Sequence, residues 1–204
     1  MLFHFSLPSY LSGLLVAPVT WLASMLLVRG PDGFGQMAIF SAADRYRYLL
    51  IFVPLAVSRI AVPALSRHFA AGDEGEYQRT LRWNLSVSTL ASAGPAIFCI
   101  AIAAPLMSLF GASFRTGWPV LAVLAFSAIP TVLNTQLGAA LLSEGRAWER
   151  AGVDLLLAAA FLTLSYWSVP ILGAIGLAAA FAAAYSLACI VLAVLLGRRS
   201  FASR

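Results

Sequence analysis

The chain has 204 residues, of which 61% are hydrophobic and only 10% are charged, and its formal net charge is +5. Water-soluble domains carry about 25% charged residues, so this composition excludes an ordinary soluble protein. All 13 basic residues are arginines. We interpret this positive charge as a signal of membrane orientation and expect no nucleic-acid partner.

Six long apolar stretches follow one another along the chain, and about 20 apolar residues are needed to cross a bilayer core as a helix. We expect membrane-spanning helices over residues 7–28, 37–64, 83–110, 118–142, 151–170 and 174–197. The predicted fold class is an all-α membrane protein. Residues 1–204 are expected to form a single bundle of six transmembrane helices.

Prolines lie near the middle of each of the first four predicted spans, at Pro18, Pro54, Pro95 and Pro130. A proline inside a helix removes a backbone hydrogen bond and kinks the helix. We therefore expect kinked helices that line a cavity. Trp21 lies away from the ends of the first span. It is expected either to pack in the core or to face this cavity.

The second span contains ionisable residues: Asp44, Arg45 and Arg47 near its outer half and Arg59 nearer its other end. A charge at such depth costs about 2.5–3.5 kcal/mol on insertion scales and is expected to face the protein interior or a hydrated cavity. Asp44 and Arg47 are three residues apart and can pair on one helical face. A guanidinium in a cavity suits a phosphate or carboxylate. The alternative is that these long side chains reach the interface.

Polar residues also enter the fourth and fifth spans. Asn134 and Gln136 follow Pro130, and two alternatives stay open for them: hydrogen bonds to neighbouring helices, or the lining of a sugar-binding lumen. Asp154 is a candidate partner for the arginines of the second span. The fifth and sixth spans are rich in alanine, so we expect them to pack closely, joined by a turn at residues 170–173.

Arginines gather in alternate loops. Eight lie in the loops 65–82 and 143–150 or at the C-terminus, whereas only Arg29 and Arg115 lie in the other loops. The positive-inside rule then predicts that both termini and the two arginine-rich loops are cytoplasmic.

Enzyme signatures are absent from the sequence: we find no phosphate-binding glycine loop, HExxH, CxxC or GxSxG pattern. Cys99 and Cys189 lie inside apolar spans, where they are expected to be small core residues. We therefore expect that the chain is not an enzyme and has no catalytic residue, metal site or cofactor.

Four stretches carry a family resemblance: LPSYLSGLLVAPVTWLASMLL at 7–27, GFGQMAIFSAADRYRYLLIFVPLAVSRIAVPALS at 33–66, LFGASFRTGWPVLAVLAF at 109–126 and GAIGLAAAFAAAY at 173–185. They resemble the C-terminal half of bacterial polysaccharide exporters, the Wzx-type flippases for lipid-linked oligosaccharides. That superfamily also contains the MATE drug antiporters and the lipid II flippase. The resemblance implies half of a twelve-helix transporter, a partner N-terminal six-helix half, and a place in the bacterial cytoplasmic (inner) membrane.

The implied substrate is an isoprenoid-pyrophosphate-linked oligosaccharide, an O-antigen unit of lipopolysaccharide or an exopolysaccharide unit, handled amid membrane lipids. The resemblance assigns Arg45, Arg47 and Arg59 to phosphate contact, Asp44 and Asp154 to coupling or pairing, and Asn134, Gln136 and Trp21 to a polar lumen. Two alternatives remain. One is half of a MATE-type cation or drug antiporter, which favours a negatively charged lumen; the other is a membrane scaffold without transport.

Overall fold

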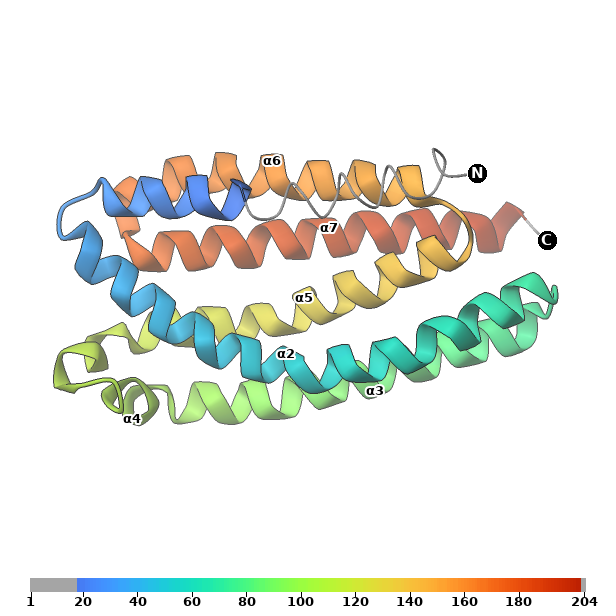
Figure 1. The fold of residues 1–204 in the computed structure, drawn as a ribbon, viewed down its shortest axis with the longest axis horizontal. Helices are drawn as coiled ribbons and strands as arrows, with labels where there is room; N and C mark the ends of the chain where they lie inside the picture. The colour runs from blue at the N-terminus through green and yellow to red at the C-terminus, as the bar shows by residue number, and fades with distance from the viewer. Residues whose placement is uncertain (1–17, 203–204) are drawn as a thin grey trace.

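A computed structural model describes residues 18–202, without the side chains of residues 58, 60–62 and 198–202. The described part is helical and contains no strand (Figure 1). Its elements are Pro18–Val28, α2 (Gly33–Ala70), α3 (Glu74–Ala101), α4 (Ala103–Ser108), the 3₁₀ helix η1 (Ala112–Gly117), α5 (Trp118–Ser143), α6 (Ala147–Leu172) and α7 (Ala174–Ala202).

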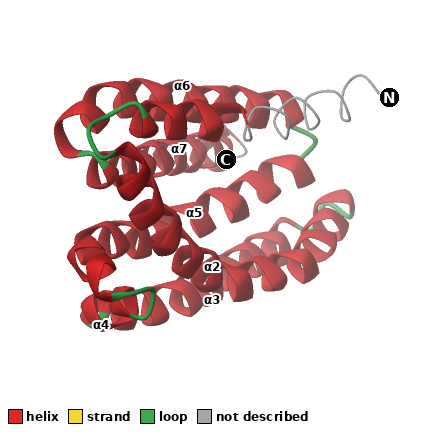
Figure 2. Ribbon diagram, turned by 60° about the vertical axis from the view of Figure 1, so that its left-hand side comes forward, coloured by secondary structure: helices red, strands yellow, loops and turns green. Residues whose placement is uncertain are grey.

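The helix α5 is the centre of the arrangement. It packs against α2 and α3 on one side and against α7 on the other, while α6 packs mainly on α7. Figure 2 shows α5 between the α2–α3 pair and the α6–α7 pair. Its long apolar side chains are accordingly buried, among them Leu121, Leu124 and Leu141.

The arginine-rich segments share one end of the bundle. The α2–α3 turn, the α5–α6 turn and the C-terminal end of α7 lie together in Figure 1, and α4, η1 and the α6–α7 turn lie at the opposite end. This is the alternation that the loop arginines predict. It fixes which loops lie on the same side, while the cytoplasmic assignment of that side remains a prediction.

The helix of the third predicted span, 83–110, has different bounds in the structure. The structure begins α3 at Glu74, where the Asp73 carboxylate accepts a hydrogen bond from the Glu76 backbone N–H (3.1 Å) and caps the helix. It ends α3 at Ala101, and α4 follows. Pro105 explains the break, because it has no N–H to donate to the Ala101 carbonyl and its ring crowds that carbonyl.

The predicted loops 65–82 and 143–150 are largely helical in the structure. The helices continue through most of them, and each connection is only three residues, 71–73 and 144–146. Helices can extend beyond the apolar core because water or caps satisfy their ends, whereas the sequence pattern marks only the apolar part.

The internal prolines are accommodated within continuous helices. Pro54 lies inside α2, Pro95 inside α3 and Pro130 inside α5, as the sequence predicts. Pro170, expected in a turn, lies instead within the last turn of α6, and the chain reverses at Gly173 alone, with φ +57°. The left-handed backbone at this position favours glycine.

Four of the described helical segments are long and apolar enough to cross a membrane by length and composition: Glu74–Ala101, Ala112–Ser143, Ala147–Leu172 and Ala174–Gly197. The apolar helix Pro18–Val28 is shorter. The 38-residue α2, which carries the four ionisable residues of the second predicted span, is not among the four. The count of six spans therefore stays a prediction.

The predicted close packing of the alanine-rich helices is present in the α6–α7 pair. A Cβ added to Gly176 of α7 would overlap the Ser168 carbonyl group of α6. The Ser168 hydroxyl also donates to the Gly176 carbonyl at 2.9 Å. The missing side chain is what lets the two backbones approach this closely.

Gly176→Ala should therefore destabilise the protein by about 1–3 kcal/mol, because its methyl group has to push α6 and α7 apart. Thermal unfolding in detergent measures this loss. The matched control is Gly152→Ala in α6, where an added Cβ meets nothing within 4 Å; it should leave stability unchanged or raise it by up to about 1 kcal/mol. Equal unfolding temperatures for the two variants would contradict the packing argument.

Candidate transport site

The first of two ion pairs within the bundle lies on α2. The Arg47 Nε donates to the Asp44 Oδ1 at 2.5 Å, and the Arg47 residue is only 5% exposed. This confirms the pairing that the i,i+3 spacing predicts. An arginine so deeply buried needs such a partner, because an isolated charge in a medium of low dielectric is costly.

Aromatic rings cover the rest of the Arg47 guanidinium. Its central carbon lies 4.4 Å from the centroid of the Phe181 ring on α7 and 4.7 Å from that of the neighbouring Tyr48. Phe181 in turn packs on Phe161 and Tyr185. Cation–π contacts of this kind strengthen when water is excluded, so Arg47 links α2 to α7.

The second ion pair lies on α6, and its arginine also bonds to α5. The Arg150 guanidinium contacts both carboxylate oxygens of Asp154, one turn away, at 2.6 and 3.0 Å. It also donates to the backbone oxygen of Asn134 at 2.9 Å and to the Asn134 side-chain oxygen at 3.0 Å. Asp154 is therefore paired with Arg150 and not with an arginine of α2.

A glycine on α5 makes room for this guanidinium. A Cβ added to Gly138 would overlap the Arg150 guanidinium group. Gly138 follows Asn134 by one turn of α5, so both residues face Arg150 from the same side of the helix. The Arg150 side chain of α6 therefore fills the space that Gly138 leaves beside α5.

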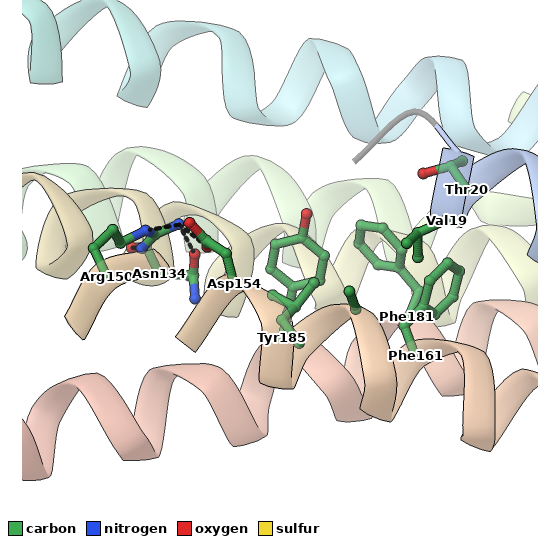
Figure 3. A pocket seen from close by; sticks show the side chains of 10 residues that line it. Val19, Thr20, Asn134, Arg150, Asp154, Phe161, Phe181 and Tyr185 are labelled. Carbon is green, nitrogen blue, oxygen red and sulfur yellow. Dashed lines mark hydrogen bonds and ion pairs between the residues drawn. The ribbon is translucent and has the colours of Figure 1, made fainter. Parts of the chain in front are cut away.

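A cavity of about 80 Å³ adjoins the Arg150 cluster, lined at one end by Asn134, Arg150 and Asp154 and at the other by aromatic rings (Figure 3). The Asn134 Nδ2 is buried and has no hydrogen-bond partner among the described atoms. Its orientation is fixed, because arginine only donates and the amide oxygen must face Arg150. The cavity is large enough to hold water, and its polar end lies at this amide.

Gln136 lies in a separate buried network between α3 and α5. Its side chain accepts from the Asn84 amide at 2.8 Å and donates to the Ser88 hydroxyl at 2.8 Å. Gln136 is only 1% exposed and does not line the cavity beside Arg150. The geometry favours the first of its two predicted alternatives, a hydrogen bond to a neighbouring helix.

The remaining candidate residues lie on exposed surfaces. Arg45 and Arg59 of α2 are exposed and have no ion-pair partner among the described residues. Trp21 is 61% exposed, so its predicted alternative of packing in the core is wrong. The helix Pro18–Val28 buries Val19, Ala23 and Leu27 instead.

The sequence prediction missed Arg150 as a site residue, because it assigned this residue to a cytoplasmic loop. The i,i+4 spacing between Arg150 and Asp154 could have revealed the pair. The aromatic partners of Arg47 had no comparable signal, since Phe181 is 134 residues away on another helix.

These features define a multi-pass helical membrane protein with ionised groups held inside its bundle. The family model described as "Lipid II flippase MurJ" matches residues 10–203, nearly the whole chain, and the chain belongs to this family. The family comprises flippases, which confirms the prediction that the chain is not an enzyme.

Relatives and a solved structure agree with this assignment. The "EPS I polysaccharide export inner membrane protein EpsE" of Ralstonia solanacearum is 35% identical over 74 residues, and that of Ralstonia nicotianae is 34% identical over 77. These matches cover 36% and 38% of this chain but only 17% and 18% of the relatives. The chain is a multi-pass membrane protein, and the two relatives are named as inner-membrane proteins.

The fold is similar to that of the MATE transporter VcmN of Vibrio cholerae, solved as a point mutant. The TM-score is 0.85 at 17% sequence identity, over 98% of this chain and 46% of that structure. The chain therefore spans about half the length of this transporter and shares the fold of that half.

Arg150→Met should destabilise the protein by up to about 3–5 kcal/mol, because it leaves the Asp154 carboxylate partly buried and unpaired. Combining it with Asp154→Leu should recover much of the loss, since no charge then remains, and thermal unfolding of the four variants of this cycle measures the coupling.

The matched control for this cycle is the exposed pair Arg79–Glu76, whose nitrogen and oxygen are 3.4 Å apart. Arg79→Met should cost less than about 1 kcal/mol. If Arg150→Met proved as mild as Arg79→Met, Arg150 would have no role in compensating a buried charge.

Proposed function

We propose that the chain is one half of a flippase that moves isoprenoid-pyrophosphate-linked oligosaccharides, such as exopolysaccharide or O-antigen units, from the cytoplasmic to the outer leaflet. Its six spans would form a single bundle with both termini in the cytoplasm, and a second six-helix bundle would complete the transporter. Membership of the lipid II flippase family, the match to about half of a MATE transporter and the similarity to polysaccharide export proteins support this proposal.

The observation that carries the substrate assignment is the pair of uncompensated guanidinium groups on α2. Arg45 and Arg59 are exposed on the same face, and both lie within the second predicted span. Exposure of this face to acyl chains would cost several kcal/mol, whereas a hydrated lumen between two bundles removes that cost. Guanidinium groups bind phosphate oxygens bidentately, so the lumen suits a pyrophosphate.

The other candidate residues take supporting roles in this proposal. Arg47 is matched by Asp44 and by aromatic rings, which makes it less available to a substrate phosphate than Arg45 or Arg59. Asp154 is matched by Arg150, so we assign it to pairing within the bundle. Trp21, exposed on the first helix, remains a candidate for the lumen surface.

The alternative functions are less favoured by these charges. A half-transporter for cationic drugs needs acidic groups facing its lumen, but both acidic residues within the predicted spans are neutralised by arginines. A scaffold without transport has no use for unpaired arginines at membrane depth.

Arg45→Ala and Arg59→Ala should each reduce the surface polysaccharide of a strain that depends on this chain by about tenfold or more, because each removes a charge-assisted contact to phosphate. Arg45→Lys should retain part of the export, since an ammonium keeps the charge without the planar fork. Immunoblots of membrane fractions check that each variant is inserted.

The control for these export assays is Arg79→Ala in the α2–α3 hairpin, where the side chain is exposed and near Glu76. It should leave export at the wild-type level. Normal polysaccharide in both the Arg45 and the Arg59 variants would refute the phosphate assignment.

The proposed orientation has its own test in a background that lacks Cys99 and Cys189. Ala71→Cys in the α2–α3 turn should react with a membrane-impermeant maleimide only after the cells are permeabilised, because the positive-inside rule places it in the cytoplasm. Ser113→Cys in η1, at the opposite end, should react in intact cells. The reverse pattern would overturn the orientation.

A further inference from the structure

Tyr48 is an exposed aromatic residue whose ring is held by a contact on its buried side. Its residue surface is 59% exposed, although its ring stacks on the guanidinium of the buried Arg47 at 4.7 Å. Arg47 is itself held by Asp44 and by Phe181. One face of the Tyr48 ring is therefore occupied by a fixed cation, and a ligand can reach the ring from its exposed side.

Tyr48 lies on the same strip of α2 as the two unpaired arginines. At 100° per residue, the positions 45, 48, 52 and 59 fall within a sector of about 60°. Phe52 in this strip is 71% exposed. The strip thus has two aromatic rings between two cations: Arg45 stands about 4.5 Å before Tyr48 along the helix axis, and Arg59 stands about 16 Å beyond it.

The cation and aromatic ring at Arg45 and Tyr48 match the chemistry of a sugar attached to a pyrophosphate. The flat face of a pyranose carries C–H groups that pack on the negatively charged face of an aromatic ring. The phosphate next to the sugar is only a few bonds away, as Arg45 is only one helical turn from Tyr48. A ring already fixed in place loses little conformational freedom when it binds, which favours affinity.

We propose that Tyr48 is a stacking platform for the first sugar of a glycan pyrophosphate, and that Arg47 is the positioning residue that holds its ring. This inference rests on the proposed function, because it requires the α2 strip to face a lumen. It makes a distinction within the site: Arg45 recognises the phosphate next to the sugar, whereas Tyr48 recognises the sugar.

The test uses the transporter formed by this chain and its second bundle, purified in nanodiscs, and compares two probes: an isoprenoid pyrophosphate that carries one N-acetylglucosamine, and the same isoprenoid pyrophosphate without sugar. Tyr48→Ala should weaken binding of the sugar-bearing probe by about tenfold and leave the sugar-free probe unchanged, because only the stacking contact is lost. Tyr48→Phe should bind both probes like the wild type, because the ring remains.

The matched control is Tyr166→Ala on α6, which removes an equally exposed tyrosine (64% exposed) and should change neither affinity. Nanodiscs made of phosphatidylglycerol, without either probe, measure how strongly the site binds the phosphate of an ordinary lipid. Tyr48→Ala should not change this binding. If Tyr48→Ala weakened both probes equally, or neither, the stacking role would be refuted and Tyr48 would be a membrane-facing anchor.

The role of Arg47 is tested by the charge-neutral double variant Asp44→Asn with Arg47→Met. It leaves Tyr48 in the sequence without its cation, so binding of the sugar-bearing probe should fall by about threefold while the sugar-free probe is unaffected. Wild-type affinity for both probes would refute the positioning role.

The two levels of the proposal fail in different ways. Arg45→Ala should weaken both probes alike, since both contain the pyrophosphate. If it weakened neither, the proposed function itself would be wrong whatever Tyr48 does. If Arg45→Ala acted as expected and Tyr48→Ala did not, only the sugar platform would be lost.

Discussion

The absence of water in a bilayer core is the constraint that orders this structure. Each polar group that enters the apolar zone needs a partner within the protein or a hydrated surface. The chain meets this need with two inter-helical arginine clusters and one amide network, all of which involve α5 or α7. Among the described residues of the predicted spans, two arginines are left unpaired, both on α2. They are therefore the groups that most need an aqueous surface.

The helix α5 connects the polar contacts of the neighbouring helices. Two of its backbone carbonyls accept hydrogen bonds from side chains of other helices. The Pro130 carbonyl accepts from the Cys189 thiol (3.0 Å), and the Asn134 carbonyl accepts from Arg150. It also carries Thr131 and Thr135, whose hydroxyls bond to its own carbonyls one turn back. Such bonds near a proline allow a helix to bend without leaving its carbonyls unsatisfied.

Much of this architecture could be predicted from the sequence, and the limits have physical causes. Long apolar stretches located the helical segments, and the spacing of Asp44 and Arg47 gave a pair that needs only one helix to form. The start of α3 was missed because a polar first turn capped by Asp73 has no apolar signal. Arg150 was missed because it was assigned to a loop, although its spacing to Asp154 marks a pair. Its contact with Asn134 on another helix leaves no mark in local spacing.

The close fit of Arg150 against Gly138 restricts how the helices can move. Arg150 donates a hydrogen bond to the backbone of α5 and forms an ion pair with Asp154 of its own helix. The helix α6 is in turn packed tightly on α7. A rearrangement that preserves these bonds must swing α5, α6 and α7 together as one rigid lever. The α2–α3 pair would then move against this unit mainly along α5, with the stacked contact between Arg47 and Phe181 as a further link to α7.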